Sequence, residues 1–170
     1  MEFARVYDVQ LTARETLLGW VRPLTQSQYT QAFPFGMRSV RGSLVEIARA
    51  EFFLARRLRE EPLPPVAEWP FSEAKQPTLA DLEPAWARHS AETRAALAGT
   101  TDWDREVTAR LVRQTGPVRL TSTKRDIALQ ILFHEVHHRA QAMAMLRQLG
   151  VEAQNLDYIR FTQRSEPDAR

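Results

Sequence analysis

Residues 124–149 read KRDIALQILFHEVHHRAQAMAMLRQL, and the spacing of apolar residues in this stretch decides the fold. Apolar side chains recur every three or four positions, which places them on one face of an α-helix. Thr121, Ser122 or Thr123 can cap the start of this helix, and Gly150 can end it. The pattern predicts a long helix with one buried face, formed by Ile127, Ile131, Ala142, Met145 and Leu149.

Three further stretches have the same helical periodicity. They run from about Val6 to Trp20, from Ser39 to about Arg59, and from Leu79 to about Leu97. A proline-rich loop over residues 62–77 joins the second of these helices to the third. Four long helices with one long crossover loop describe a four-helix bundle.

Residues 105–120 have a different pattern, because short runs rich in valine, leucine and threonine flank Thr115-Gly116-Pro117. This pattern predicts a short hairpin or irregular segment before the last helix. Residues 155–161 are expected to form a short turn. We therefore predict an all-α chain with a single helical domain over residues 1–164 and a frayed tail over residues 165–170.

The composition excludes several classes of protein. The chain has 170 residues, of which 44% are hydrophobic, and this suffices for the core of one domain. It has no cysteine, which excludes a disulfide framework, a cysteine-ligated zinc site and a cysteine nucleophile. The net charge is +2 and arginines alternate with acids, so we expect no nucleic-acid partner. Without a signal peptide or an apolar run of about 18 residues, we expect a cytoplasmic protein with no membrane partner.

Three of the four histidines lie within the segment His134-Glu135-Val136-His137-His138. His134 and His138 are one helical turn apart in the middle of the apolar face, a spacing that lets two imidazoles reach one metal ion. The alternative is two core histidines that bond to carbonyls or carboxylates. We favour the metal, and we expect His137 at the edge of this face and His89 partly exposed on another helix.

The same segment matches the metalloprotease signature H-E-x-x-H, in which Glu135 would be the general base. A protease of that class places this helix behind a sheet and takes a further ligand downstream. The surrounding sequence predicts helices instead, and it offers only Glu152 and Asp157 beyond the helix end. The sequence therefore argues against a protease.

A third metal ligand is expected from a facing helix, where Glu46 and Glu51 are the candidates. Glu46 lies among apolar residues, where a carboxylate is unfavourable unless it meets a cation. Two histidines and one glutamate leave coordination positions open, which is typical of catalytic sites. A bound water or thiol would have a lowered pKa there.

The segment His134-x-x-x-His138-Arg139-Ala140-Gln141 resembles the H-x-x-x-H-R-G-Q motif of the DinB (DinB/YfiT-like) family of metal-dependent proteins. Residues 43–51 resemble the family segment that carries the first metal ligand, and residues 155–161 resemble its closing segment. The resemblance implies an up-down-down-up four-helix bundle, often a homodimer. It also implies a divalent ion such as nickel or zinc, held by three histidines. Glu46 stands where the family has its first histidine, and a carboxylate also suits iron or manganese.

Some DinB relatives are transferases that use low-molecular-weight thiols such as bacillithiol or mycothiol. The resemblance therefore leads us to expect a metal-dependent S-transferase that joins such a thiol to an electrophilic substrate. Arg139 is a candidate to hold an anionic group of thiol or substrate, or to form a structural ion pair. Two alternatives stay open: a metal-assisted hydrolase with Glu46 or Glu135 as base, and a non-catalytic, stress-related dimeric helical protein with a degenerate metal site.

Overall fold

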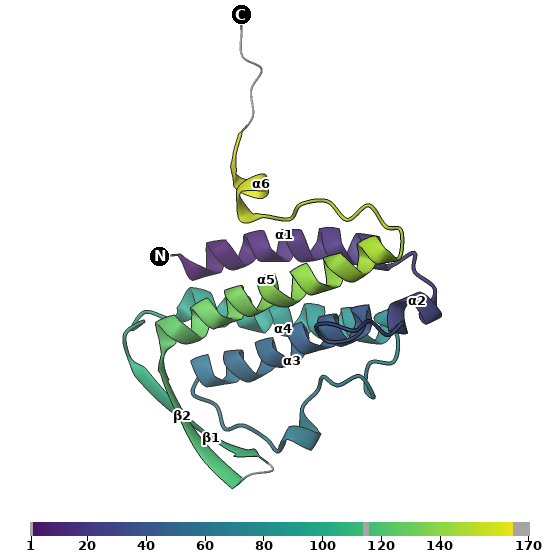
Figure 1. The fold of residues 1–170 in the computed structure, drawn as a ribbon. Coiled ribbons are helices and arrows are strands. Elements are labelled where there is room, and N and C mark those ends of the chain that lie inside the picture. Colours follow the sequence, from purple (N-terminus) through teal and green to yellow (C-terminus); the bar gives the residue numbers. More distant parts are fainter. Residues whose placement is uncertain (1, 114–115, 165–170) are drawn as a thin grey trace, which may run out of the picture.

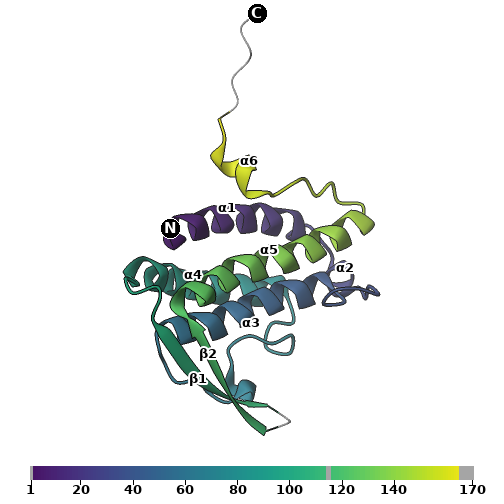
Figure 2. The ribbon, with the colours of Figure 1, turned by 60° about the vertical axis from the view of Figure 1, so that its left-hand side comes forward.

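The computed structural model describes residues 2–113 and 116–164. Its body consists of four long helices that pack on one another: α1 (Phe3–Val21), α3 (Val40–Leu58), α4 (Leu79–Gly99) and α5 (Lys124–Gln148) (Figures 1 and 2). The short helices are α2 (Gln26–Thr30), α6 (Tyr158–Thr162) and the 3₁₀ turn Val66–Glu68. Across the described residues, no helix combines the length and the apolar character needed to span a bilayer.

The expectation of a purely α-helical chain is wrong in one respect, because the predicted hairpin is a regular two-stranded sheet. Strands β1 (Glu106–Arg113) and β2 (Gly116–Thr123) pair antiparallel, and Val107 on the inner face is buried. β-branched residues that alternate between the two faces favour this extended structure. The fold is therefore mostly helical with a small sheet, which extends from one end of the helical body (Figure 2).

Side-chain caps mark the starts of α4 and α5. Thr123, one of the three candidates, caps α5 by accepting a hydrogen bond of 3.1 Å from the Asp126 amide. Thr78 and Asp81 form a reciprocal capping box at the start of α4. These caps confirm the predicted starts of both helices, whereas the short helix α2 was not predicted.

Among the described residues, α3 and α5 share the most extensive helix–helix contact. Small residues on the facing surfaces are fully buried and let the two backbones approach, namely Ala48, Ala55, Ala128 and Ala142. Larger apolar residues of the same helices, such as Leu44, Ile131 and Met145, fill the spaces between them. This packing holds the glutamate-bearing side of α3 against the histidine-bearing side of α5.

Candidate metal centre

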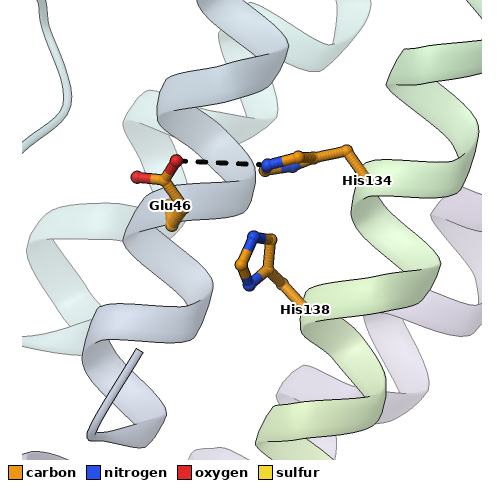
Figure 3. Close-up of side chains that lie close together, drawn as sticks. All are labelled: Glu46, His134 and His138. Atoms are coloured by element: carbon orange, nitrogen blue, oxygen red, sulfur yellow. Dashed lines mark ion pairs between the residues drawn. The ribbon is translucent and has the colours of Figure 1, made fainter. Parts of the chain in front are cut away.

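The three predicted ligands come together between α3 and α5. Glu46, His134 and His138 each offer one ligand atom, and these atoms all lie within 4.8 Å of one another. His134 Nε2 is 4.0 Å from Glu46 Oε1, and the two imidazole rings are 4.4 Å apart (Figure 3). The structure thus brings the two imidazoles, paired by their helical spacing, together with Glu46, one of the two candidate carboxylates of the facing helix.

Both imidazoles are held in the neutral form that binds metal ions. Burial lowers the pKa of His134 to about 4, and the neighbouring His138 and His137 add to this effect. Burial also lowers the pKa of His138, although the hydrogen bond that its Nδ1 donates to Gln141 opposes the shift. At neutral pH neither ligand has to lose a proton before a cation binds.

Gln141 fixes the tautomer of His138. The Gln141 side-chain oxygen lies 2.9 Å from His138 Nδ1. Since an amide oxygen only accepts hydrogen bonds, Nδ1 carries the hydrogen and Nε2 keeps its lone pair. The ring nitrogen remote from the His138 attachment point faces Glu46 and His134 in Figure 3. An outer hydrogen bond of this kind orients a metal-binding histidine.

The turn before α3 packs directly on Gln141. Gly36 has a φ of +55°, and a Cβ at this position would lie 2.7 Å from the Gln141 oxygen. Glycine is therefore required both by the backbone conformation and by the close approach. The Gln141 nitrogen lies 2.9 Å from Nε2 of His137. His137 is exposed and lies outside the group formed by Glu46, His134 and His138.

The donor set fits a divalent cation. Glu46 contributes a negative charge and the two neutral imidazoles contribute lone pairs, a combination that suits zinc, nickel, iron or manganese. Glu46 is partly exposed, and its second oxygen accepts a hydrogen bond of 3.3 Å from Arg49. Its first oxygen faces His134. Three protein ligands leave positions for a substrate atom or water.

Glu135 points away from this centre, into the interior of the molecule. It is 2% exposed and accepts hydrogen bonds of 3.0 Å and 2.6 Å from Nε and Nη2 of Arg14. Glu51, the other candidate ligand, is 2.8 Å from the same guanidinium and also accepts from Tyr7 and Trp86. Neither carboxylate is available as a ligand or as a general base, so the metalloprotease motif is only a formal match.

This buried network was not predicted from the sequence. Arg14 is 5% exposed, and its Nη1 donates to Ser90 at 2.6 Å, so that all four long helices contribute to the network. A signal was present, since Tyr7, Gln10 and Arg14 follow the same three-to-four spacing as the buried apolar residues of α1.

Opposing effects act on the two ionised partners. Burial opposes ionisation of Glu51, but Arg14 and the hydrogen bonds from Tyr7 and Trp86 outweigh it and hold its pKa below 4.5. Burial likewise opposes the charge of Arg14, and the two carboxylates outweigh it and raise its pKa. Arg14 and Glu51 are thus both ionised, and their opposite charges stabilise each other.

Arg139 belongs to the same network and not to a substrate site. It is buried, donates to Gln10 at 2.6 Å and lies 3.7 Å from Glu135. The structural ion pair is therefore the role that the geometry supports. His89 was expected to be partly exposed and is buried instead, because Phe52 and Phe71 pack against its ring.

A sizeable cavity lies away from the candidate metal centre. It has a volume of about 710 Å³ and lies between α1 and α4, the helix pair opposite α3 and α5. Arg14 and Ser90 reach it, but they bond to each other and leave the cavity mainly apolar. We place the candidate site at Glu46, His134 and His138, because those residues carry chemistry that the cavity lacks.

Comparisons with known proteins support the fold and identify the family. The sequence pattern of the DinB family matches residues 3–169. The crystal structure of a DinB family member from Shewanella denitrificans superposes with a TM-score of 0.50 over 99% of this chain and 89% of that one, at 14% identity. No curated protein matches the chain. The chain belongs to the DinB family.

Proposed function

We propose that this DinB family member is a metal-dependent S-transferase that holds a zinc or nickel ion through Glu46, His134 and His138. The observation that carries the proposal is the convergence of three ligand atoms within 4.8 Å, from two helices whose packing holds them in place. With three protein ligands, the ion would keep positions free for a thiol. The proposed reaction joins a low-molecular-weight thiol, of the bacillithiol or mycothiol kind, to an electrophilic substrate.

A bound divalent ion would lower the pKa of a coordinated thiol and supply a thiolate at neutral pH. The chain's own residues orient the site: Gln141 keeps His138 Nε2 free, and Gly36 lets the preceding turn hold Gln141 in place. The absence of cysteine agrees with a thiol that comes from outside the chain.

Glu46 in place of the family histidine shifts the chemistry of the centre. A carboxylate adds one negative charge and a hard oxygen donor, which widens the choice of ion towards iron and manganese. It also lowers the net charge of the occupied site by one unit. Zinc and nickel remain the first choice because two of the three donors are imidazoles.

A metal-assisted hydrolase is the weaker alternative. It needs a general base beside the ion, and Glu135 is held by Arg14 in the interior. Glu46 would have to serve as both ligand and base. The remaining alternative is a stress-related dimeric protein with a degenerate metal site, and metal binding separates it from both enzymes.

The first experiment is elemental analysis of the protein, followed by titration with zinc and with nickel. We expect one ion per chain and a higher melting temperature with metal. His134→Ala, His138→Ala and Glu46→Ala should lose both effects. His137→Ala is the matched control, since it removes the adjacent exposed histidine and should keep the ion. A protein that takes up no ion would refute metal dependence, and so would ligand variants that bind the ion like the parent.

The second experiment offers an electrophile, such as a haloaromatic compound, with each of a panel of thiols. We expect product only with metal and thiol together. Product that forms equally well without thiol would contradict the S-transferase and favour the metal-assisted hydrolase. No turnover of any pair by the metal-loaded protein would favour the degenerate site.

We further propose that the four long helices form the up-down-down-up bundle of a single domain, and that two cytoplasmic copies associate. Support for association comes from large apolar side chains exposed on α5 and α6, among them Phe133 and Ile159 at 64% and 56% exposure. Sedimentation equilibrium should give twice the chain mass, and Phe133→Glu should yield monomers. A parent protein that is monomeric at high concentration would rule out the dimer.

A further inference from the structure

Arg57, near the end of α3, is a buried arginine without an acidic partner. It is 7% exposed, and within the described ranges no carboxylate lies within 4.0 Å of its guanidinium. Its Nη2 donates to Ser122 Oγ at 3.1 Å and weakly to the Leu120 carbonyl at 3.4 Å. Its Nε is buried and has no hydrogen-bond partner. Burial without a countercharge lowers its pKa.

The contrast with Arg14 shows what is missing at Arg57. Both arginines are buried, but Arg14 contacts Glu51 and Glu135, whereas Arg57 contacts neutral oxygens and the ring of Phe53. A buried cation without a countercharge is strongly unfavourable in a protein interior. Among the described residues, Arg57 therefore lacks the countercharge that Arg14 has.

A cavity beside Arg57 offers the space for an anion. It has a volume of about 550 Å³ and lies between the end of α3, the loop that follows it and strand β1. Arg57 and Arg110 are the basic residues of its lining. Pro62, Leu63 and Val107 provide an apolar wall.

Glu60 and Glu61 also line this cavity, but both are already paired with basic groups outside its lining. Glu60 is paired with Arg105 at 2.7 Å and with Lys124 at 2.9 Å. Glu61 is paired with Arg59 at 2.7 Å and with Arg56 at 3.3 Å. Each of these two acids is thus paired with two basic groups, whereas Arg57 and Arg110 of the lining have no carboxylate within 4.0 Å among the described residues, and this favours an anion.

We propose that this cavity is a binding site for a small organic anion, a carboxylate with a short apolar chain. The carboxylate accepts hydrogen bonds from the guanidinium groups of Arg57 and Arg110, and its apolar chain lies against Pro62, Leu63 and Val107. The site is separate from the metal centre and does not depend on the proposed transferase activity.

The test uses hexanoate as the probe, with 1-hexanol and acetate as comparisons. Binding is followed by ¹⁵N NMR of the arginine side chains and by isothermal titration. We expect hexanoate to shift the Arg57 Nε–H resonance and to bind at least tenfold more tightly than either comparison. Equal binding of hexanol would show that the charge is not recognised, and equal binding of acetate that the apolar wall is not used. Either result overturns the proposal.

Variants separate a binding role from a structural one. Arg57→Met should bind hexanoate at least tenfold more weakly, yet melt no lower than the parent without ligand. Arg88→Met, at an exposed arginine of α4, is the control and should bind like the parent. A lower melting temperature of Arg57→Met without ligand would show that Arg57 serves the hairpin and would contradict the proposal.

A further variant provides the countercharge within the chain. Leu63→Glu places a carboxylate in the wall of the cavity, where it can pair with Arg57 or Arg110. We expect this variant to bind hexanoate at least tenfold more weakly and to melt at or above the parent's temperature. Undiminished hexanoate binding by Leu63→Glu would show that the anion binds elsewhere, even if Arg57→Met failed to fold.

Discussion

Replacing Arg14 with methionine should be among the most destabilising single changes in this chain. Methionine retains an apolar stem similar to that of arginine but lacks the guanidinium. Within the described residues, this guanidinium is the only one that contacts both Glu51 and Glu135, at 2.8 Å and 2.6 Å. Both carboxylates are buried, so neither can be solvated after the change. Breaking a buried ion pair by removing one partner costs about 3–5 kcal/mol.

This loss is large compared with the total stability of a domain, about 5–15 kcal/mol. For a chain of this size, each kcal/mol lowers the melting temperature by roughly 2–4 °C, which gives a drop of about 6–20 °C. Urea denaturation followed by tryptophan fluorescence measures the loss, since Trp86 donates to Glu51 in the same network. Arg22→Met is the matched control, because Arg22 also pairs with two glutamates but lies at the surface. It should unfold like the parent.

The pH dependence gives the prediction a sign. In the parent, the pKa of Glu51 is below 4.5, so its stabilising effect is complete above that pH and is lost as the pH falls through the lowered pKa. In Arg14→Met, burial acts without the guanidinium and raises the pKa of Glu51 above 4.5. The variant should therefore lose stability as the pH rises, and its deficit relative to the parent should shrink between pH 7 and pH 5.

Two results would refute this reasoning. One is an Arg14→Met protein that is no less stable than Arg22→Met. The other is a deficit that stays constant or grows between pH 7 and pH 5, because ionised Glu51 would then not be the source of the loss. Combining Arg14→Met with Glu51→Gln and Glu135→Gln removes all three charges and should recover most of the stability.

Three further predictions concern the metal centre. Gln141→Leu should weaken zinc binding by about 10–100-fold in isothermal titration, because His138 loses the bond that fixes its tautomer, and unchanged affinity would contradict that role. Gly36→Ala should lower stability by about 1–2 kcal/mol in urea titration, because alanine is strained at a φ of +55°, and should also weaken zinc binding by displacing Gln141. The metal-free protein should lose stability as the pH falls from 6.5 towards 4, because the lowered pKa of His134 keeps it neutral only in the folded state; His134→Phe should reduce this slope in denaturation at several pH values.

Periodicity was sufficient to predict the elements that build the metal centre. The long helices extend over many turns, so apolar spacing and capping residues locate them to within a few residues. The pair His134 and His138 could be found because a four-residue spacing fixes relative direction on any helix. Glu46 required the family resemblance in addition, since pattern alone did not distinguish it from Glu51.

Burial of polar residues could not be predicted in the same way. Hydrophobic patterning treats a charge as a sign of exposure, and Arg14, Glu51 and Glu135 are buried because each compensates the others across three helices. His89 was placed wrongly for a different reason. Its cover comes partly from Phe71 in the proline-rich loop, and the path of a long loop is not encoded in a local repeat.

Helix α5 links the candidate metal centre to the buried network, because it contributes residues to both. Successive residues of an α-helix are about 100° apart, so His134 and Glu135 point in different directions, as do His138 and Arg139. The i, i+4 pair His134 and His138 faces Glu46, and the i, i+4 pair Glu135 and Arg139 faces Arg14 and Gln10 of α1. A rotation of α5 by one residue would bury an imidazole against Arg14 and turn a carboxylate towards Glu46. The ion pairs of the interior therefore fix the rotation of the helix that presents the two histidines. We expect a substitution at Arg14 to weaken metal binding by Glu46, His134 and His138, although Arg14 contacts none of these residues.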